Sequence, residues 1–124
     1  MARVNQGIYK KYISEKRKVI SAWETLENEY WEDGNFSGDS ECLFAFLDEV
    51  NYLYEEASDL HAKMENLLES QKFEDDKKVD KYKNYINEIY QCMCDMKDYA
   101  EQARHLIGID LTDSEMYTLD HLKI

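Results

Sequence analysis

Apolar residues recur along the chain at alternating spacings of three and four, which is the pattern of amphipathic α-helices. Three such stripes follow one another, over residues 3–32, 40–70 and 76–107, and the first is interrupted at Lys16. The first stripe contains Tyr9, Tyr12, Val19, Trp23, Leu26 and Tyr30. The second contains Leu43, Phe46, Val50, Leu53, Ala57, Leu60, Met64 and Leu67. The third contains Val79, Tyr82, Ile86, Ile89, Met93, Met96, Ala100, Ala103 and Ile107. The pattern therefore predicts three long helices.

The breaks between the stripes are short and polar, and the chain contains no proline. Short connections favour antiparallel neighbours. After Gly108, the segment Thr112–Glu115 has the form of a capping box, and it predicts a short helix with Met116, Leu119 and Leu122 on one side. We expect one all-α domain over residues 1–124, an antiparallel bundle of three long amphipathic helices plus a short C-terminal helix. The regular heptads also allow helices shared with a second chain, so a homodimer stays open.

Lys16 interrupts the first stripe and is the one charged residue in the three apolar seams. In a hairpin folded about residue 36, it comes level with residues 55–57, where the small Ala57 leaves room. We therefore expect an ion pair between Lys16 and Glu56 that sets the register of the first two helices. The alternative is a lysine whose ammonium group extends outward to water.

The charge of the chain is large and unevenly distributed. Asp and Glu number 27 against 15 Lys and Arg, giving a formal net charge of -12. Residues 1–23 carry six bases and one acid, whereas residues 24–69 carry one base and fourteen acids. Such a chain is not expected to bind nucleic acid directly. The longest apolar run, residues 42–47, is too short to cross a bilayer and no signal-peptide core is seen, so we expect a cytoplasmic protein without membrane contact.

The residue types that support catalysis or metal binding do not form a known motif. Cys92 and Cys94 lie two residues apart on a predicted helix, so they point in different directions and cannot jointly hold zinc. None of the three histidines, His61, His105 and His121, sits in a nucleophile or metal motif. We expect no enzyme activity, no catalytic residue, no metal site and no cofactor.

The segment Asp33–Glu41 resembles the front of an EF-hand calcium loop. Oxygen-bearing side chains stand at positions one, three and five of the loop, and Gly38 stands at position six. The pattern then departs from the family, because Ser40 replaces an aliphatic residue and Phe44 replaces the closing glutamate. The alternative interpretation is a connector in which Asp39 or Ser40 caps the second helix.

One face of the second predicted helix combines acids with a tyrosine, away from the apolar seam. Its members are Glu41, Asp48, Glu49, Tyr52, Glu55, Glu56 and Asp59. A solvated surface would explain such a run, but solubility is normally served by mixed charges, and tyrosine is enriched at interfaces. We interpret this face as a docking surface for a protein partner with a basic surface. Trp31 and Tyr90 are candidate aromatic anchors, or else cover an edge of the core.

Three functions follow from these features. The first is a non-enzymatic acidic protein-binding module, an inhibitor that docks into a basic nucleic-acid-binding groove of a nuclease or other defence protein. Small anti-restriction and anti-CRISPR proteins are similar in composition and size. The second is a helical scaffold or secretion partner, because Trp31–Gly34 between two amphipathic helices is loosely similar to the Trp-x-Gly turn of WXG100-type proteins, with one residue more between Trp and Gly. The third is a calcium-dependent module, based on the loop at Asp33–Glu41.

Overall fold

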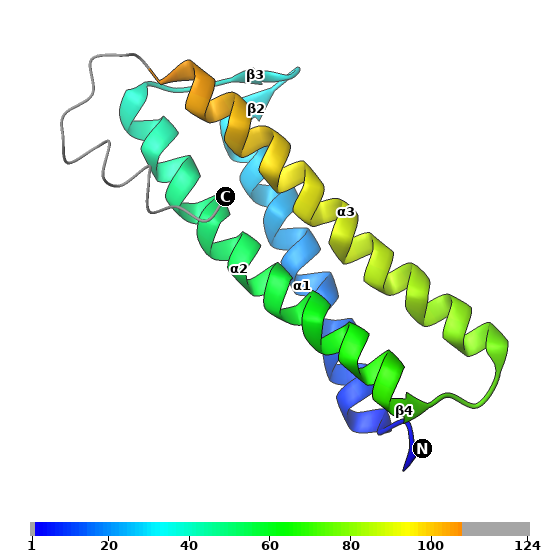
Figure 1. Cartoon of the computed structure of the whole chain (residues 1–124). Helices are drawn as coiled ribbons and strands as arrows, with labels where there is room; N and C mark the ends of the chain where they lie inside the picture. Colours follow the sequence, from blue (N-terminus) through cyan, green and yellow to red (C-terminus); the bar gives the residue numbers. More distant parts are fainter. Residues whose placement is uncertain (1, 108–124) are drawn as a thin grey trace.

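The computed structural model describes residues 2–107 and contains three long helices within that range, so the predicted all-α class is confirmed. The helices are α1 (Gln6–Tyr30), α2 (Ser40–Ser70) and α3 (Asp76–Leu106). They lie side by side, and α2 runs in the opposite direction to α1 and α3 (Figure 1). The predicted short helix containing Met116, Leu119 and Leu122 lies outside the described residues.

Each helix begins at a side chain that satisfies a free backbone N–H group in the first turn. The Oδ1 atoms of Asn5, Asp39 and Asp75 accept hydrogen bonds of 3.0, 3.0 and 2.9 Å from the third backbone N–H after each. Capping by Asn or Asp fixes where a helix starts. The starts of α2 and α3 are those that the sequence predicts, and α1 begins three residues later than predicted.

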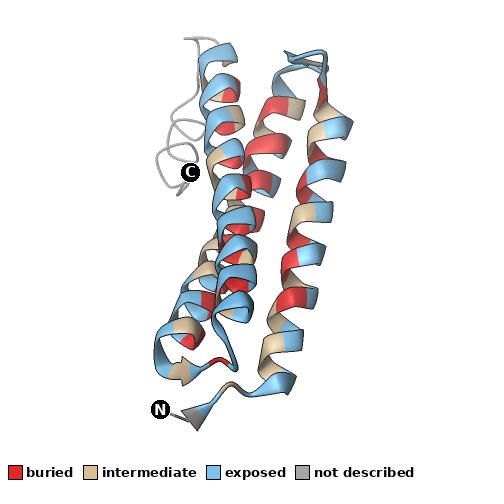
Figure 2. Cartoon of the chain, turned by 90° about the vertical axis from the view of Figure 1, so that its right-hand side faces the viewer, coloured by how far each residue is buried: buried red, intermediate tan, exposed pale blue. Residues whose placement is uncertain are grey.

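The core lies along the three apolar seams. Buried residues occupy the sides of the helices that face one another, as Figure 2 shows. The largest side chains that are almost wholly buried are Tyr82, Phe46, Leu47, Met64, Ile89, Met96 and Val50. At the end of the bundle where α1 meets α2, several rings pack together, with centroid distances of 4.9 Å for Trp31 and Tyr99 and 5.7 Å for Trp31 and Phe46. Trp31 and Phe46 therefore belong to the core, and Tyr99 packs against it.

Two very short strand pairs close the ends of the bundle, and neither was predicted. Strands β2 (Trp31–Glu32) and β3 (Asn35–Phe36) form an antiparallel hairpin between α1 and α2. Its two-residue turn places Asp33 at φ 51° and Gly34 at φ 79°, as a type I′ turn requires. At the other end, β1 (Ala2–Arg3) pairs in parallel with β4 (Gln71–Lys72), which ties the start of the chain to the connection between α2 and α3.

Lys16 is buried as part of the first seam, but the predicted ion pair with Glu56 is wrong. Its ammonium group instead pairs with Glu88 of α3 and lies 4.5 Å from the ring centre of Tyr85. On the surface of α1, position 16 turns toward α3, so Glu88 and not Glu56 pairs with the ammonium group. A second contact, from the Tyr99 hydroxyl to Glu27 Oε1 at 2.8 Å, also joins residues 72 apart and confirms the parallel register of α1 and α3.

None of the helices within residues 2–107 is long and apolar enough to cross a bilayer.

Candidate protein-binding groove

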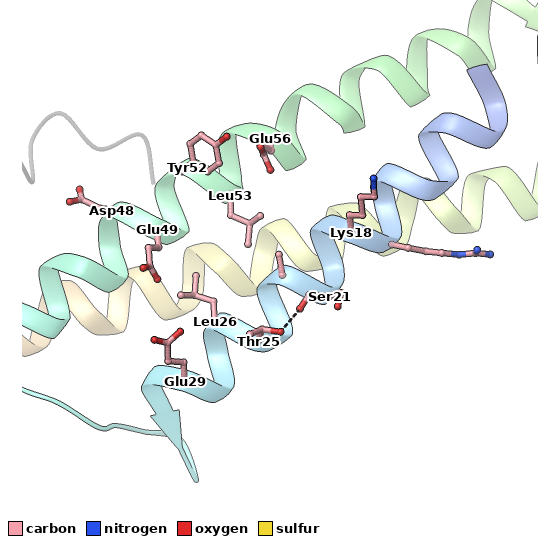
Figure 3. A pocket seen from close by; sticks show the side chains of 12 residues that line it. Lys18, Ser21, Thr25, Leu26, Glu29, Asp48, Glu49, Tyr52, Leu53 and Glu56 are labelled. Carbon is pink, nitrogen blue, oxygen red and sulfur yellow. Dashed lines mark hydrogen bonds between the residues drawn. The ribbon is translucent and has the colours of Figure 1, made fainter. Parts of the chain in front are cut away.

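An open groove with a volume of about 930 Å³ runs between α1 and α2 (Figure 3). Its floor contains Leu26 and Leu53, and the exposed Ala22 lies beside them. The small side chains of Ser21 and Thr25 continue the α1 wall, where the Thr25 hydroxyl donates a hydrogen bond of 3.0 Å to the backbone oxygen of Ser21. The groove therefore offers an apolar floor that is not covered by α3.

The two ends of this groove differ in charge. Glu29, Asp48 and Glu49 lie at the end near the hairpin, while Lys18 of α1 and Glu56 of α2 lie at the other end (Figure 3). Arg17 precedes Lys18 in α1 and also lines the groove. Partial burial and the neighbouring Glu29 carboxylate raise the pKa of Glu49 above its usual range. Within residues 2–107, no basic side chain lies at salt-bridge distance from these three acids. In the part of the chain that the structure describes, the acidic end is thus a cluster of like charges without a salt-bridge partner.

Tyr52 stands at the rim of the groove between the two ends. It is 65% exposed, the largest exposure among the large hydrophobic side chains of the described residues that stand out at the surface. A hydrogen bond to the Glu56 carboxylate raises the pKa of its hydroxyl. An exposed, oriented tyrosine beside an apolar floor provides contact area for a partner at low conformational cost.

The remaining residues of the predicted acidic face lie apart from this groove. Asp59 lines a neighbouring groove of about 350 Å³, together with Glu56 and Lys63. Glu41 is exposed in the first turn of α2, and Glu55 is half-buried and engaged in an interaction. The structure therefore brings four of the seven predicted residues to the main groove, namely Asp48, Glu49, Tyr52 and Glu56.

Sequence reasoning missed acids that α1 and α3 add to this end of the bundle. Residues 24–51 and 95–107 together carry twelve acids and two Lys or Arg residues. Glu24, Glu27 and Asp95 line a groove between α1 and α3, where burial, Glu27 and Asp98 raise the pKa of Asp95. The block of acids in residues 24–69 signals part of this cluster, but the contribution of α3 depends on how the helices pack.

The two candidate aromatic anchors have different positions. Trp31 is 7% exposed and packs inside the ring cluster, so it covers the core and is not a surface anchor. Its indole Nε1 has no hydrogen-bond partner within the described part of the chain. Tyr90 is 49% exposed on α3, beside the ring of His61 at a centroid distance of 5.9 Å, and it does not line the α1–α2 groove.

The loop that resembles an EF-hand has structural roles in this chain. Asp33 and Gly34 form the hairpin turn, the Ser37 hydroxyl donates to the backbone oxygen of Tyr30 at 3.1 Å, and Asp39 caps α2. The hydrogen bonds from Cys42 to Asp39 hold the pKa of that carboxyl below its usual range. Among residues 2–107, no three His, Cys, Asp or Glu side chains are grouped so as to hold a metal ion.

The cysteines and histidines are likewise placed as parts of the helices. Cys92 is buried, and burial raises the pKa of its thiol to about 12, whereas Cys42 and Cys94 are half-buried. His61 lies 3.1 Å from Glu65, and His105 lies 3.8 Å from Glu101, each four residues apart on one helix. His121 lies outside the described residues.

Comparison with known proteins adds no relative to this picture: no family model, curated protein or solved structure matches the chain.

Proposed function

We propose that this chain is a non-catalytic protein-binding module that docks a basic protein partner on the acidic end and apolar floor of the α1–α2 groove. The observation that carries the proposal is the combination of Tyr52, exposed at the rim, with the acids Glu29, Asp48 and Glu49 beside an uncovered apolar floor. Either an apolar patch or a charged patch alone is common on a protein surface. Together, at one groove, they are typical of an interface.

Electrostatics support a basic partner in particular. Partial burial, and then repulsion by the Glu29 carboxylate, raise the pKa of Glu49, so the charged form of this acid is disfavoured in the free protein. A Lys or Arg side chain placed between these carboxylates would relieve that repulsion and gain charge-assisted hydrogen bonds. The chain as a whole carries a charge of -12, so its field would also accelerate encounter with a basic surface.

Within this class, the density of acids favours a partner whose basic groove ordinarily holds nucleic acid. The twelve acids near the hairpin end are spread over three helices and the hairpin, so they present negative charge on several sides of the bundle. Such a surface competes for the lysines and arginines that neutralise phosphates. In this proposal the protein acts as an inhibitor of a nuclease or other defence protein, as anti-restriction and anti-CRISPR proteins do.

Affinity capture with matched charge variants tests the proposal. The acidic-end variant is Glu29→Lys, Asp48→Lys and Glu49→Lys, and the control variant is Glu65→Lys, Glu69→Lys and Asp80→Lys, which changes the net charge equally. All six positions are exposed. From a lysate of the cell that makes the protein, the parent and the control should retain the same proteins, and the acidic-end variant should lose them.

Two further measurements separate the possible partners. The association rate of a captured protein should fall as salt rises, and it should fall by about tenfold or more in the acidic-end variant. Duplex DNA or RNA should release the partner if its nucleic-acid groove is the surface engaged. Equal retention by the parent and the acidic-end variant would refute the docking site. Retention that nucleic acid does not disturb would refute the inhibitor form of the proposal.

A further inference from the structure

The α2 wall of the groove carries acids along its whole length. Asp48, Tyr52 and Glu56 follow one another at spacings of four, so they share one side of α2, and all three are exposed. Asp48 and Glu56 lie about 12 Å apart along the helix, at about 1.5 Å per residue. Figure 3 shows the ring of Tyr52 between the two carboxylates. A partner therefore needs positive charge over about two helical turns to match this wall.

The α1 wall is small and uncharged in its middle. Ser21, Ala22 and Thr25 are exposed and line the groove. Their short side chains allow a packed element to approach the axis of α1 closely. Charge on this wall lies toward its ends, with Glu29 near the hairpin and Lys18 at the other end. The negative charge of the groove is therefore concentrated at the hairpin end, where both walls are acidic.

Both walls are interior stretches of long helices, so they offer no backbone hydrogen bonds to a ligand. The groove lies within Gln6–Tyr30 and Ser40–Ser70, where backbone N–H and C=O groups bond along each helix. An extended segment would gain no backbone hydrogen bonds from these walls, whereas a helix satisfies its own backbone groups. From Lys18 to Glu29 the groove spans about 16 Å, or about three helical turns. This geometry favours a helix as the occupant.

We propose that the groove binds one amphipathic helix of a basic protein, which packs between α1 and α2 as a fourth helix with its most basic end beside the hairpin. The apolar face of this helix contacts Leu26, Leu53 and the ring of Tyr52. Its Lys and Arg side chains extend from the flanks of that face to the carboxylates. The inference rests on the proposed function, because it names the element of the basic partner that the docking site recognises.

The polarity of the bound helix follows from the charges at the two ends. Glu29 and Glu49 approach one another across the groove at the hairpin end, as Figure 3 shows. A Lys or Arg placed there contacts two carboxylates and gains charge-assisted hydrogen bonds. At the other end, Lys18 on the α1 wall offsets Glu56 on the α2 wall. A cation gains less at that end, so the most basic part of the helix lies beside the hairpin.

Charge also favours this helix over other occupants of the groove. Residues 108–124 carry four acids and one Lys, so that segment would add negative charge to an acidic groove. A second copy of the chain would bring the same acidic α2 wall against this one. Nucleic acid is anionic throughout. A basic amphipathic helix supplies both the apolar face and the cations that the α2 wall requires.

Two synthetic peptides of equal composition test the proposal by fluorescence anisotropy with the full chain. Both are about four helical turns long and carry leucines along one face. In the flank peptide, the lysines lie on the flanks of that face, within one half of the helix. In the back peptide, the lysines lie on the opposite face. The flank peptide should bind about tenfold more tightly, because its lysines reach the carboxylates while its leucines face the floor. Equal affinities, or no binding of the flank peptide, would overturn the proposal.

Matched variants of the protein locate the bound peptide. The acidic-end variant should bind the flank peptide about tenfold more weakly, and its control should bind as the parent does. Ala22→Phe keeps every acid but places a bulky ring on the α1 wall, so it should also weaken binding by about tenfold. Ala62→Phe, at an exposed alanine of α2 outside the groove, should have no effect. Circular dichroism checks the fold of each variant. Unchanged binding by a folded Ala22→Phe variant would overturn packing between the helices.

A nitroxide label on the basic end of the flank peptide tests the polarity. In nuclear magnetic resonance spectra of the complex, the label should broaden the signals of the hairpin, residues 31–36, more than those of residues 14–18. The reverse pattern would overturn the proposed polarity.

The outcomes separate this inference from the proposed function. Suppose that the acidic-end variant loses the proteins captured from a lysate, while Ala22→Phe retains them and the two peptides bind equally. The docking site would then stand and the helical occupant would be refuted. Suppose instead that the peptides and variants behave as described, but the captured proteins do not depend on the acidic end. The groove would then bind basic helices, and the proposed function would be refuted.

Discussion

Removing the carboxylate of Glu88 should destabilise the bundle more than removing the ammonium group that it pairs with. The side chain of Lys16 is 7% exposed and that of Glu88 is 52% exposed. In Glu88→Gln the buried ammonium group loses its counter-charge and keeps the cost of leaving water. In Lys16→Met the apolar stem still fills the seam, and the Glu88 carboxylate is free to be hydrated.

The exposure of the two groups sets the size of each effect. Breaking a fully buried ion pair costs about 3–5 kcal/mol, whereas an exposed pair is worth about 0.2–1 kcal/mol. With one group buried and the other half-exposed, we expect Glu88→Gln to lower the free energy of unfolding by about 1–2 kcal/mol. For Lys16→Met we expect a change between zero and a gain of about 1 kcal/mol, after loss of the contact with Tyr85.

Urea denaturation followed by circular dichroism measures both changes and their coupling. In the Lys16→Met background, Glu88→Gln should have almost no further effect, so the double-mutant cycle should give a coupling of about 1–2 kcal/mol. Glu74→Gln, which breaks the exposed pair of Glu74 and Lys78, serves as a control and should change little. Equal cost for Glu88→Gln in both backgrounds, or a larger cost for Lys16→Met, would refute this reasoning.

Three further predictions concern the hairpin, the α2 cap and the cysteines. Gly38→Ala should lower the free energy of unfolding by about 1–3 kcal/mol, because Gly38 has φ 153° and a Cβ there would lie 2.8 Å from the Cβ of Cys42; an unchanged urea midpoint would contradict it. The lowered pKa of Asp39 implies a contribution to stability that is complete above about pH 4 and is lost as the pH falls through that pKa. Asp39→Asn keeps a capping oxygen and should flatten that acidic part of the stability profile in acid titrations followed by circular dichroism. Finally, iodoacetamide at pH 8 should modify Cys94 well before Cys92, because Cys92 is buried and burial raises the pKa of its thiol to about 12. Mass spectrometry of timed samples measures the order, and modification of Cys92 first would contradict its burial between the helices.

The three helices could be predicted from sequence because each seam repeats for many turns and each start has a capping side chain. The hairpin could not, since strands of two residues are too short to show an alternating pattern. Its signal was the dipeptide Asp33–Gly34, which supplies the two positive φ angles of a type I′ turn. Burial of Trp31 follows from that hairpin, which turns the chain back over the ring cluster.

The partners of side chains at the interfaces depend on information that periodicity does not contain. A seam pattern places Lys16 in the core, but two helices alone suggested Glu56 as its partner. The true partner, Glu88, follows from the side on which α3 packs. The same holds for the groove. The sequence pattern predicts that the acids of α2 share one face of the helix. That Glu29 approaches Glu49, and that Lys18 lines the same groove, follows only from how α1 packs on α2.

The constant offset of 72 residues between α1 and α3 has a consequence for the order in which the bundle folds. Contacts such as Lys16 with Glu88 and Glu27 with Tyr99 close a loop that includes all of α2, whereas each helical hairpin closes through a short connection. Because the entropy of loop closure must be overcome first, local hairpins form before distant pairs. Loss of either long-range contact should therefore raise the unfolding rate constant and leave the folding rate constant almost unchanged. These contacts thus contribute to the kinetic stability of the bundle.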